Sequence, residues 1–405
     1  MTFYIPSLQL IVALLTIGGL AVVAYEKNEN QQKLTVRQSH TGVHESLELK
    51  TPVKTLWNLQ ATDVKEGTTY AGCVYLLTDD KNLQSFDAKT GEHHWDIEIP
   101  TERTTGLACS ANEEFDFIAV SHYDGLALVE RHSGAVLWSK SIIQGLSTPV
   151  IYNERIFAAS PNGKAYAFDL NSGEILWEHD YLHDAPPDPR GFDGNRARFG
   201  DKPARPGAAS TDGKIVYFSV FDQCRVVAID CLSGERHWAF NTQGWMLCRP
   251  AISEKYVLAG SQDDHVYCID KETGKEAWKF KTNSRVEASP STDGEHVFIG
   301  SCDANLYCLD IETGEKVWHT KTEKRKKYGG PIYEQAFITK DVIYLPSMEG
   351  QVYALNKSNG KLLWQVRPSE GSEIDMSFTD GKRLFVGTRL NFDDEGDEAF
   401  YCLGK

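Results

Sequence analysis

The sequence lacks the short motifs that mark common enzyme classes. It contains no G-x-S-x-G, no H-E-x-x-H, no Walker loop and no dinucleotide-binding fingerprint. It also has fewer basic than acidic residues, which gives a formal net charge of −15 over 405 residues. Phosphate binding needs a basic face, so this balance argues against nucleic acid as the main partner.

The nine cysteines lack the C-x-x-C spacing of structural zinc sites, so we expect no metal. Three of them, Cys268, Cys308 and Cys402, fall in one repeated column where seven of eight residues are small. We therefore interpret these three as small buried apolar residues. An odd total leaves at least one thiol free, which favours a reducing compartment and is the best argument for a cytoplasmic location.

No segment beyond the N-terminus has a sustained 3.6-residue apolar period, so almost no helix is expected. A nine-residue pattern from an acidic residue or Asn to Trp occurs seven times instead, and in every copy a Gly precedes the Trp by four residues. This order is typical of a hairpin turn followed by a strand that buries a large ring. The copies end at Trp95, Trp138, Trp177, Trp238, Trp278, Trp318 and Trp364.

The spacing of these tryptophans, counted from Trp57, is 38, 43, 39, 61, 40, 40 and 46 residues. About forty residues suit a four-stranded propeller blade and are too many for one solenoid coil. One unit is predicted as an extended Arg285–Asp293 followed by strands at 295–300, 305–310 and 316–320.

The two chain ends predict how the ring closes. Phe400–Leu403 matches the third strand of a repeat, but the chain stops before the following Trp strand. Lys54–Asn58, with Trp57, is a fourth strand with no blade before it. We therefore predict an all-β fold, a single eight-bladed propeller whose last blade pairs both ends and leaves no free sheet edge. The alternative is an open array with mismatched ends.

These repeats resemble the Trp-docking repeat of the PQQ-type propellers, over about residues 51–405. That family includes quinoprotein dehydrogenases and the BamB lipoproteins of outer-membrane assembly. The resemblance implies the fold and gives the eight tryptophans, Trp57 included, a structural role. Because one fold hosts many functions, it leaves the activity open.

The chain is expected to have three parts. Residues 1–25 contain the apolar run Leu8–Ala24 and are predicted to be a signal peptide or membrane anchor, residues 26–50 a flexible linker, and residues 51–405 the propeller. Lys27, Lys33 and Arg37 follow the run, which by the positive-inside rule favours a cytoplasmic propeller. The first cysteine is Cys73, so we expect no lipid attachment of the BamB type.

Two connections between blades depart from the repeat. Tyr181–Arg205 adds about twenty residues, and Lys321–Lys327 is a short basic run. The first is as well explained by a solvated loop as by a functional one, whereas a short basic run is most often just a solvated loop. Both should lie on the same face of the propeller, with candidate partner-binding residues around them: Arg205, Arg249, Arg285, Glu287, Tyr328, Glu373 and Asp375.

The leading functional hypothesis is a non-catalytic scaffold that binds protein partners in the cell envelope, as BamB does. The alternatives are a small quinone-dependent dehydrogenase and a ligand sensor that uses the axial funnel. No catalytic residue or cofactor is predicted, although Glu373 or Asp375 near the axis would suit a base if PQQ were bound. The N-terminal segment, if retained, would tether the protein to a membrane.

Overall fold

The computed structural model describes residues 15–17, 20–22, 49, 51–60, 64–78, 80–99, 101, 108–111, 117–122, 124–181, 208–221, 224–322, 330–390 and 398–405. Throughout these ranges the chain forms strands, turns and bends, with no helix. The expectation of an all-β fold is therefore confirmed.

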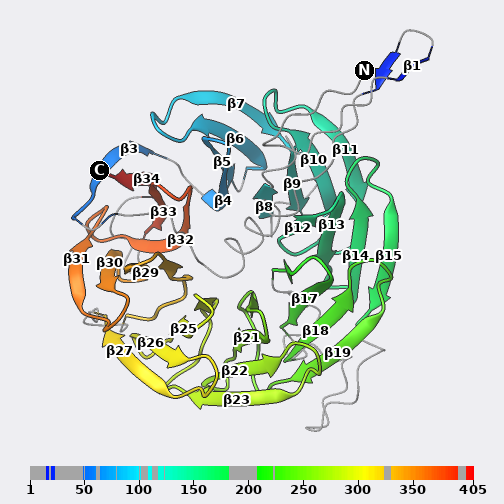
Figure 1. Ribbon diagram of the computed structural model, residues 1–405. Helices are drawn as coiled ribbons and strands as arrows, with labels where there is room; N and C mark the ends of the chain where they lie inside the picture. The colour runs from blue at the N-terminus through cyan, green and yellow to red at the C-terminus, as the bar shows by residue number, and fades with distance from the viewer. Residues whose placement is uncertain are drawn as a thin grey trace.

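Eight four-stranded sheets are arranged as blades around a central axis, with each first strand innermost (Figure 1). Blades 1 to 4 consist of β4 (Val64–Tyr70), β5 (Cys73–Thr78), β6 (Asn82–Asp87), β7 (His93–Glu98); β8 (Ala108–Ala111), β9 (Phe117–His122), β10 (Gly125–Glu130), β11 (Val136–Ser141); β12 (Val150–Tyr152), β13 (Arg155–Ala159), β14 (Lys164–Asp169), β15 (Ile175–Asp180); β16 (Ser210–Thr211), β17 (Ile215–Val220), β18 (Arg225–Asp230), β19 (Arg236–Asn241). Blades 5 to 7 consist of β20 (Ala251–Ile252), β21 (Tyr256–Gly260), β22 (His265–Asp270), β23 (Glu276–Lys281); β24 (Ser291–Thr292), β25 (His296–Gly300), β26 (Asn305–Asp310), β27 (Lys316–Lys321); β28 (Phe337–Ile338), β29 (Val342–Ser347), β30 (Gln351–Asn356), β31 (Leu362–Val366).

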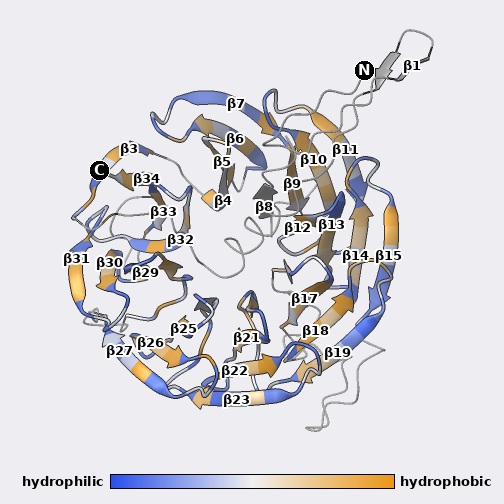
Figure 2. Cartoon of the chain, in the orientation of Figure 1, coloured by the Kyte–Doolittle hydropathy of each residue, from blue (hydrophilic) through white to orange (hydrophobic). Residues whose placement is uncertain are grey.

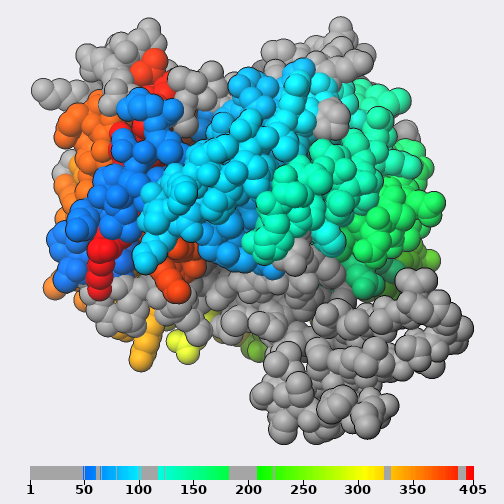
Figure 3. Space-filling model, turned by 90° about the horizontal axis from the view of Figure 1, so that it is seen from above, coloured from blue at the N-terminus to red at the C-terminus, as the bar shows by residue number. Residues whose placement is uncertain are grey.

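The eighth blade joins the two ends of the propeller. It contains β32 (Glu373–Thr379), β33 (Leu384–Arg389), β34 (Ala399–Gly404) and, as its outer strand, β3 (Lys54–Leu59). Trp57 lies opposite Cys402 and Leu59 opposite Phe400 in this pairing. In Figure 3 the blue N-terminal part of the ring lies against the red C-terminal residues at the rim. The predicted closure is confirmed.

Within the apolar run near the N-terminus the structure describes two short strands. β1 (Leu15–Ile17) and β2 (Leu20–Val22) pair with each other. Most of residues 1–50 lies outside the described residues, so the signal or anchor and the linker stay predictions. Within the described ranges no helix is long and apolar enough to span a bilayer.

A ring of tryptophans links each blade to the next. Every indole N–H donates to a main-chain carbonyl of the following blade over 2.7–3.2 Å, the acceptors being those of Ala88, Arg131, Leu170, Cys231, Lys271, Ile311, Lys357 and Leu49. Seven of the rings also cover the Gly of the next repeat, which has a φ between 68° and 76°. A Cβ there would lie within 3 Å of the ring, so the repeat needs Gly for its conformation and for its contact.

The turn before each of the seven repeat tryptophans is closed by the side chain of its first residue, which is acidic in six copies and Asn356 in the seventh. In blade 6 the Asp310 carboxylate accepts hydrogen bonds from the Glu312 and Thr313 amides and the Thr313 hydroxyl, and these bonds lower its pKa. The Gly314 amide donates to the Asp310 carbonyl over 2.9 Å. This arrangement is the physical basis of the repeated pattern.

The core lies between the blades. Middle strands such as β18 and β22 are hydrophobic, whereas outer strands such as β19 and β23 alternate in hydropathy (Figure 2). The residue opposite each tryptophan belongs to the predicted small column, and Cys268, Cys308 and Cys402 are buried there as expected. Opposite the ring a small side chain leaves room for the bulky neighbour.

The innermost strands are shorter than the sequence pattern predicts. In the unit predicted to be extended over Arg285–Asp293, only β24 pairs with its neighbour. The residues before it bond to turns instead, with Val286 N–H donating to Ser261 O and Cys302 N–H to Arg285 O. The bond from Val286 joins blade 6 to blade 5.

Candidate functional site

One face of the propeller carries the connections from each fourth strand to the next first strand, together with the turns between second and third strands. Threonines just after the fourth strands form hydrogen bonds that hold these connections to the turns. The amides of Thr242, Thr282 and Thr322 donate to carbonyls of these turns over 2.6–2.8 Å, and their hydroxyls bond the same carbonyls. We name this the connection face. The Tyr181–Arg205 and Lys321–Lys327 connections follow β15 and β27, so they belong to the same set.

The predicted partner-binding residues fall into three groups. Arg205 and Tyr328 lie outside the described residues, as does nearly all of both unusual connections. Arg285 is 53% exposed on the connection face and contacts Glu287 at 3.3 Å. Glu287 also accepts a hydrogen bond from the Gln262 amide over 2.7 Å, which holds this pair in place.

Glu373 has a different environment from the one expected for a rim residue. It is buried in β32, and its carboxylate lies 3.4 Å from the Arg389 guanidinium. It therefore presents little surface to a partner. Asp375, two residues later, is exposed.

Arg249 and Asp375 belong to a charged cluster near the axis. Two carboxylates that the sequence analysis missed, Glu66 and Glu334, complete it. The four residues come from blades 5, 8, 1 and 7, in or just before the innermost strands seen in Figure 1. The Ser377 hydroxyl donates to Glu334 over 2.8 Å and links blade 8 to blade 7.

Three groups of this cluster have shifted pKa values. Burial raises the pKa of Glu66 to about 7, opposed by the positive charge of Arg249 and reinforced by Asp375. Burial likewise raises the pKa of Glu334 to about 7, opposed by the Ser377 hydrogen bond and reinforced by Asp375 and Glu66. Burial lowers the pKa of Arg249, against the attraction of Glu66.

Chemically, the cluster combines one guanidinium with three carboxylates, two of which exchange protons near neutral pH. Searched over the described residues, no group of three or more His, Cys, Asp or Glu side chains is arranged to hold a metal ion. Groups with shifted pKa values often mark functional sites, although structural ion pairs shift them as well. No motif identifies Glu66 or Glu334, because the innermost strands carry the weakest part of the repeat.

The cluster predicts a specific dependence of stability on pH. A carboxyl with a folded pKa near 7 and an unfolded pKa near 4.5 makes the folded state bind more protons between those values. Stability should therefore fall as pH rises from about 4.5 to 7. Since one pKa unit corresponds to about 1.4 kcal/mol, each group costs about 3 to 4 kcal/mol above pH 7.

Glu66→Gln and Glu334→Gln should consequently raise the melting temperature at pH 8 and leave it nearly unchanged at pH 4.5. Thermal melts of the full chain at both pH values measure this difference. Glu254→Gln, at an exposed carboxylate, is the matched control and should have little effect at either pH. Equal effects of the two axial substitutions at both pH values would contradict the proposed titration.

A comparison with known proteins finds a family whose model matches most of the chain. The family model described as "Outer membrane protein assembly factor BamB" matches residues 21–182 and 222–382. The chain is 28% identical over 108 residues to the outer membrane protein assembly factor BamB of Burkholderia pseudomallei, covering 26% of this chain and 27% of that one. In the curated BamB sequences that it matches, the aligned part spans 27% to 44% of their length.

Solved structures share the fold over most of the chain. BamB from Moraxella catarrhalis superposes with a TM-score of 0.67 at 14% identity, covering 87% of this chain and all of that one. A europium-containing methanol dehydrogenase superposes with a TM-score of 0.65 at 12% identity, covering 90% and 96%. At these identities the likeness concerns the fold alone.

Proposed function

Because the chain belongs to the BamB family of outer membrane protein assembly factors, we propose that it is a non-catalytic scaffold that binds protein partners in the cell envelope. Its relatives carry outer membrane protein assembly in their names, and the same process is proposed for this chain. The partners would be envelope or membrane proteins.

The observation that carries this proposal is the composition of the connection face. Three aliphatic side chains are exposed there, Ile143 at 81%, Leu247 at 41% and Leu390 at 37%, and Arg285 adds a half-exposed guanidinium. Trp245 is the one tryptophan that does not belong to the ring of tryptophans linking the blades. On the connection face it packs against Phe221 at a centroid distance of 5.1 Å. Aromatic residues and Arg are enriched in protein interfaces, and exposed apolar groups beside them favour binding of another protein.

The N-terminal segment, if retained, would tether the propeller to a membrane. Residues 1–25 are proposed as a signal or anchor and 26–50 as a linker, which keeps the propeller in the envelope. A cytoplasmic orientation remains the alternative that the positive residues after the apolar run favour.

Charge reversal and apolar-to-acid substitution on the connection face should abolish partner capture. We expect Leu247→Asp, Arg285→Glu and Ile143→Asp together to lower the recovery of crosslinked partners by at least about tenfold, because interface centres carry most of the binding energy. Capture is measured by mass spectrometry after crosslinking of the tagged full chain in intact cells. Arg205→Glu, at the other predicted contact, is expected to act in the same direction.

The control is Leu232→Asp, in the turn between β18 and β19 on the opposite face, where the side chain is 74% exposed. It should leave capture intact, and all variants should keep nearly the parental melting temperature. Loss of capture with Leu232→Asp, and not with the triple variant, would assign the binding face to the other side.

A further inference from the structure

A cysteine, a histidine, a tyrosine and an arginine meet where blades 1 and 2 join, on the face opposite the connection face. Cys73 begins β5, and its thiol lies 3.8 Å from Nδ1 of His94 in β7. Arg131 follows β10 and lies over the ring of Tyr70, with its guanidinium carbon 5.3 Å from the ring centre. The imidazole is exposed and the thiol half-buried, so solutes can reach them.

Tyr75 in this group has a buried hydroxyl that forms no hydrogen bond. Burial raises the pKa of Tyr75, and the Cys73 thiol raises it further while Arg131 opposes this. The thiol and the guanidinium are therefore near neighbours of the hydroxyl, although neither satisfies it. A buried hydroxyl without a partner is costly, so this site favours a group that brings an acceptor.

Two other blades show what a tyrosine at this position normally contacts. Tyr75, Tyr217 and Tyr344 all lie opposite the residue that pairs with the docking tryptophan. The Tyr217 hydroxyl donates to Asp212 over 3.4 Å, and the Tyr344 hydroxyl accepts from the Leu49 amide over 2.6 Å. Among these three, the tyrosine beside a half-buried thiol is the one left without a hydrogen bond.

Exposure separates Cys73 from most other thiols of the chain. Of the eight cysteines whose surroundings the structure describes, six are buried, and Cys73 and Cys302 are half-buried. All eight are free thiols. Cys302 lies near Tyr333 and Glu287, with no histidine among the groups that act on it. Thiol reactivity needs access and a route for the proton, and Cys73 has both.

We propose that Cys73 is a site of reversible S-thiolation by anionic low-molecular-weight disulfides of the glutathione class. His94 Nδ1 takes the proton as the Cys73 Sγ attacks one sulfur of the disulfide. The disulfide S–S bond breaks, a new bond forms between Sγ and the attacked sulfur, and the other half leaves as a thiolate that takes up the proton. The Arg131 guanidinium attracts the carboxylates of the incoming molecule, and the Tyr75 hydroxyl donates to an acceptor on the attached group.

Asp87, an acid near His94, is engaged in its own turn. Asp87, whose pKa is lowered mainly by the Thr90 amide, is held by hydrogen bonds within its own turn and also interacts with His94. Its carboxylate is therefore committed to the turn.

Glutathione disulfide added to the full-length reduced protein tests the proposal, with adducts located by peptide mass spectrometry. We expect one early adduct at Cys73, lost in Cys73→Ser and kept in Cys302→Ser. His94→Gln should slow its formation by about tenfold or more, as expected for loss of a positioned base. Arg131→Gln should slow the reaction with glutathione disulfide but not with cystamine, a cationic disulfide of similar reactivity.

Tyr75→Phe gives a second readout that does not depend on the attacking base. It should lower the equilibrium fraction of adduct in a glutathione redox buffer while the melting temperature stays at or above that of the parent. Preferential modification of Cys302, or rates at Cys73 that are the same in the parent, His94→Gln and Arg131→Gln proteins, would overturn the assignment.

Discussion

A chain that begins at residue 61 is expected to lose most of its folding stability, whereas one that begins at residue 46 should melt close to the full chain. The first truncation removes β3, so blade 8 keeps three strands and exposes the edge of β34. It also removes Trp57, whose indole donates to Ala88 O of blade 1. We expect the melting temperature to fall by more than about 10 °C, with aggregation on heating.

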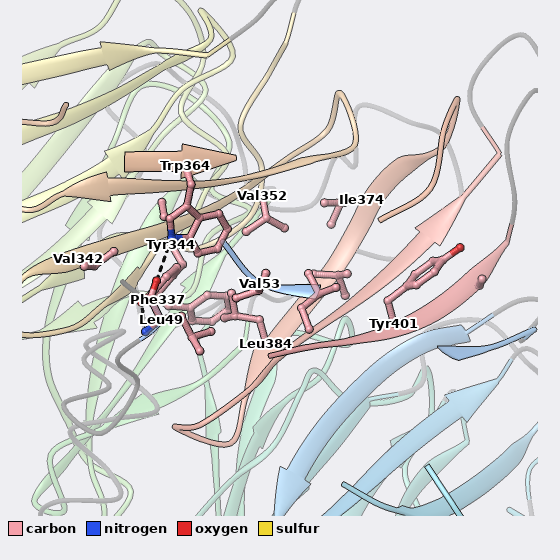
Figure 4. Packing of buried hydrophobic residues seen from close by; sticks show 14 residues of the cluster. Leu49, Val53, Phe337, Val342, Tyr344, Val352, Trp364, Ile374, Leu384 and Tyr401 are labelled. Carbon is pink, nitrogen blue, oxygen red and sulfur yellow. Dashed lines mark hydrogen bonds between the residues drawn. The ribbon is translucent and has the colours of Figure 1, made fainter. Parts of the chain in front are cut away.

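The segment just before β3 contributes separately. Leu49 takes the place of a repeat turn in blade 8, because its carbonyl accepts from the Trp364 indole over 3.0 Å and its amide donates to the Tyr344 hydroxyl (Figure 4). Leu49 and Val53 are buried in the same cluster. A chain that begins at residue 54 should therefore melt between the other two. Equal melting temperatures for chains starting at residues 46 and 61 would mean that the ring closes without β3.

Replacing one docking tryptophan should have the second largest effect. Trp278→Ala removes a buried indole that packs between blades 5 and 6 and donates to Ile311 O over 2.7 Å. Truncation of a buried Trp costs about 3–5 kcal/mol, since it leaves a cavity and an unsatisfied carbonyl. Urea denaturation of the full chain measures the loss of free energy of unfolding.

Two glycine substitutions separate the contact with the ring from the backbone conformation. Gly314 has a φ of 72°, and an added Cβ would lie 2.6 Å from the Trp278 ring. Gly294 has a φ of 92°, and an added Cβ would meet no atom within 4 Å. Both alanine variants pay the left-handed backbone cost, about 1 kcal/mol, but only Gly314→Ala must also displace the indole. Equal losses in the two variants would show that ring contact contributes little.

Local repetition made the fold predictable. The turn from Asp310 to Gly314 follows from side-chain hydrogen bonds within five residues, and the same chemistry recurs in each unit. The closing pair was found because Phe400–Leu403 matches a third strand that lacks its fourth. Burial of Cys268 and Cys308 followed from their place in the repeat rather than from cysteine chemistry.

By itself, the sequence determined the all-β class, the eight blades and the closure at Trp57. Each of these depends on a pattern within one repeat or on the match between two repeats. The tertiary structure alone decided that Glu66, Arg249, Glu334 and Asp375 meet near the axis, that Glu373 is buried against Arg389, and that Tyr75 ends beside Cys73 without a hydrogen bond. The physical reason is that ring closure brings together side chains from distant blades, and burial and pKa values depend on those neighbours rather than on the residues next in the chain.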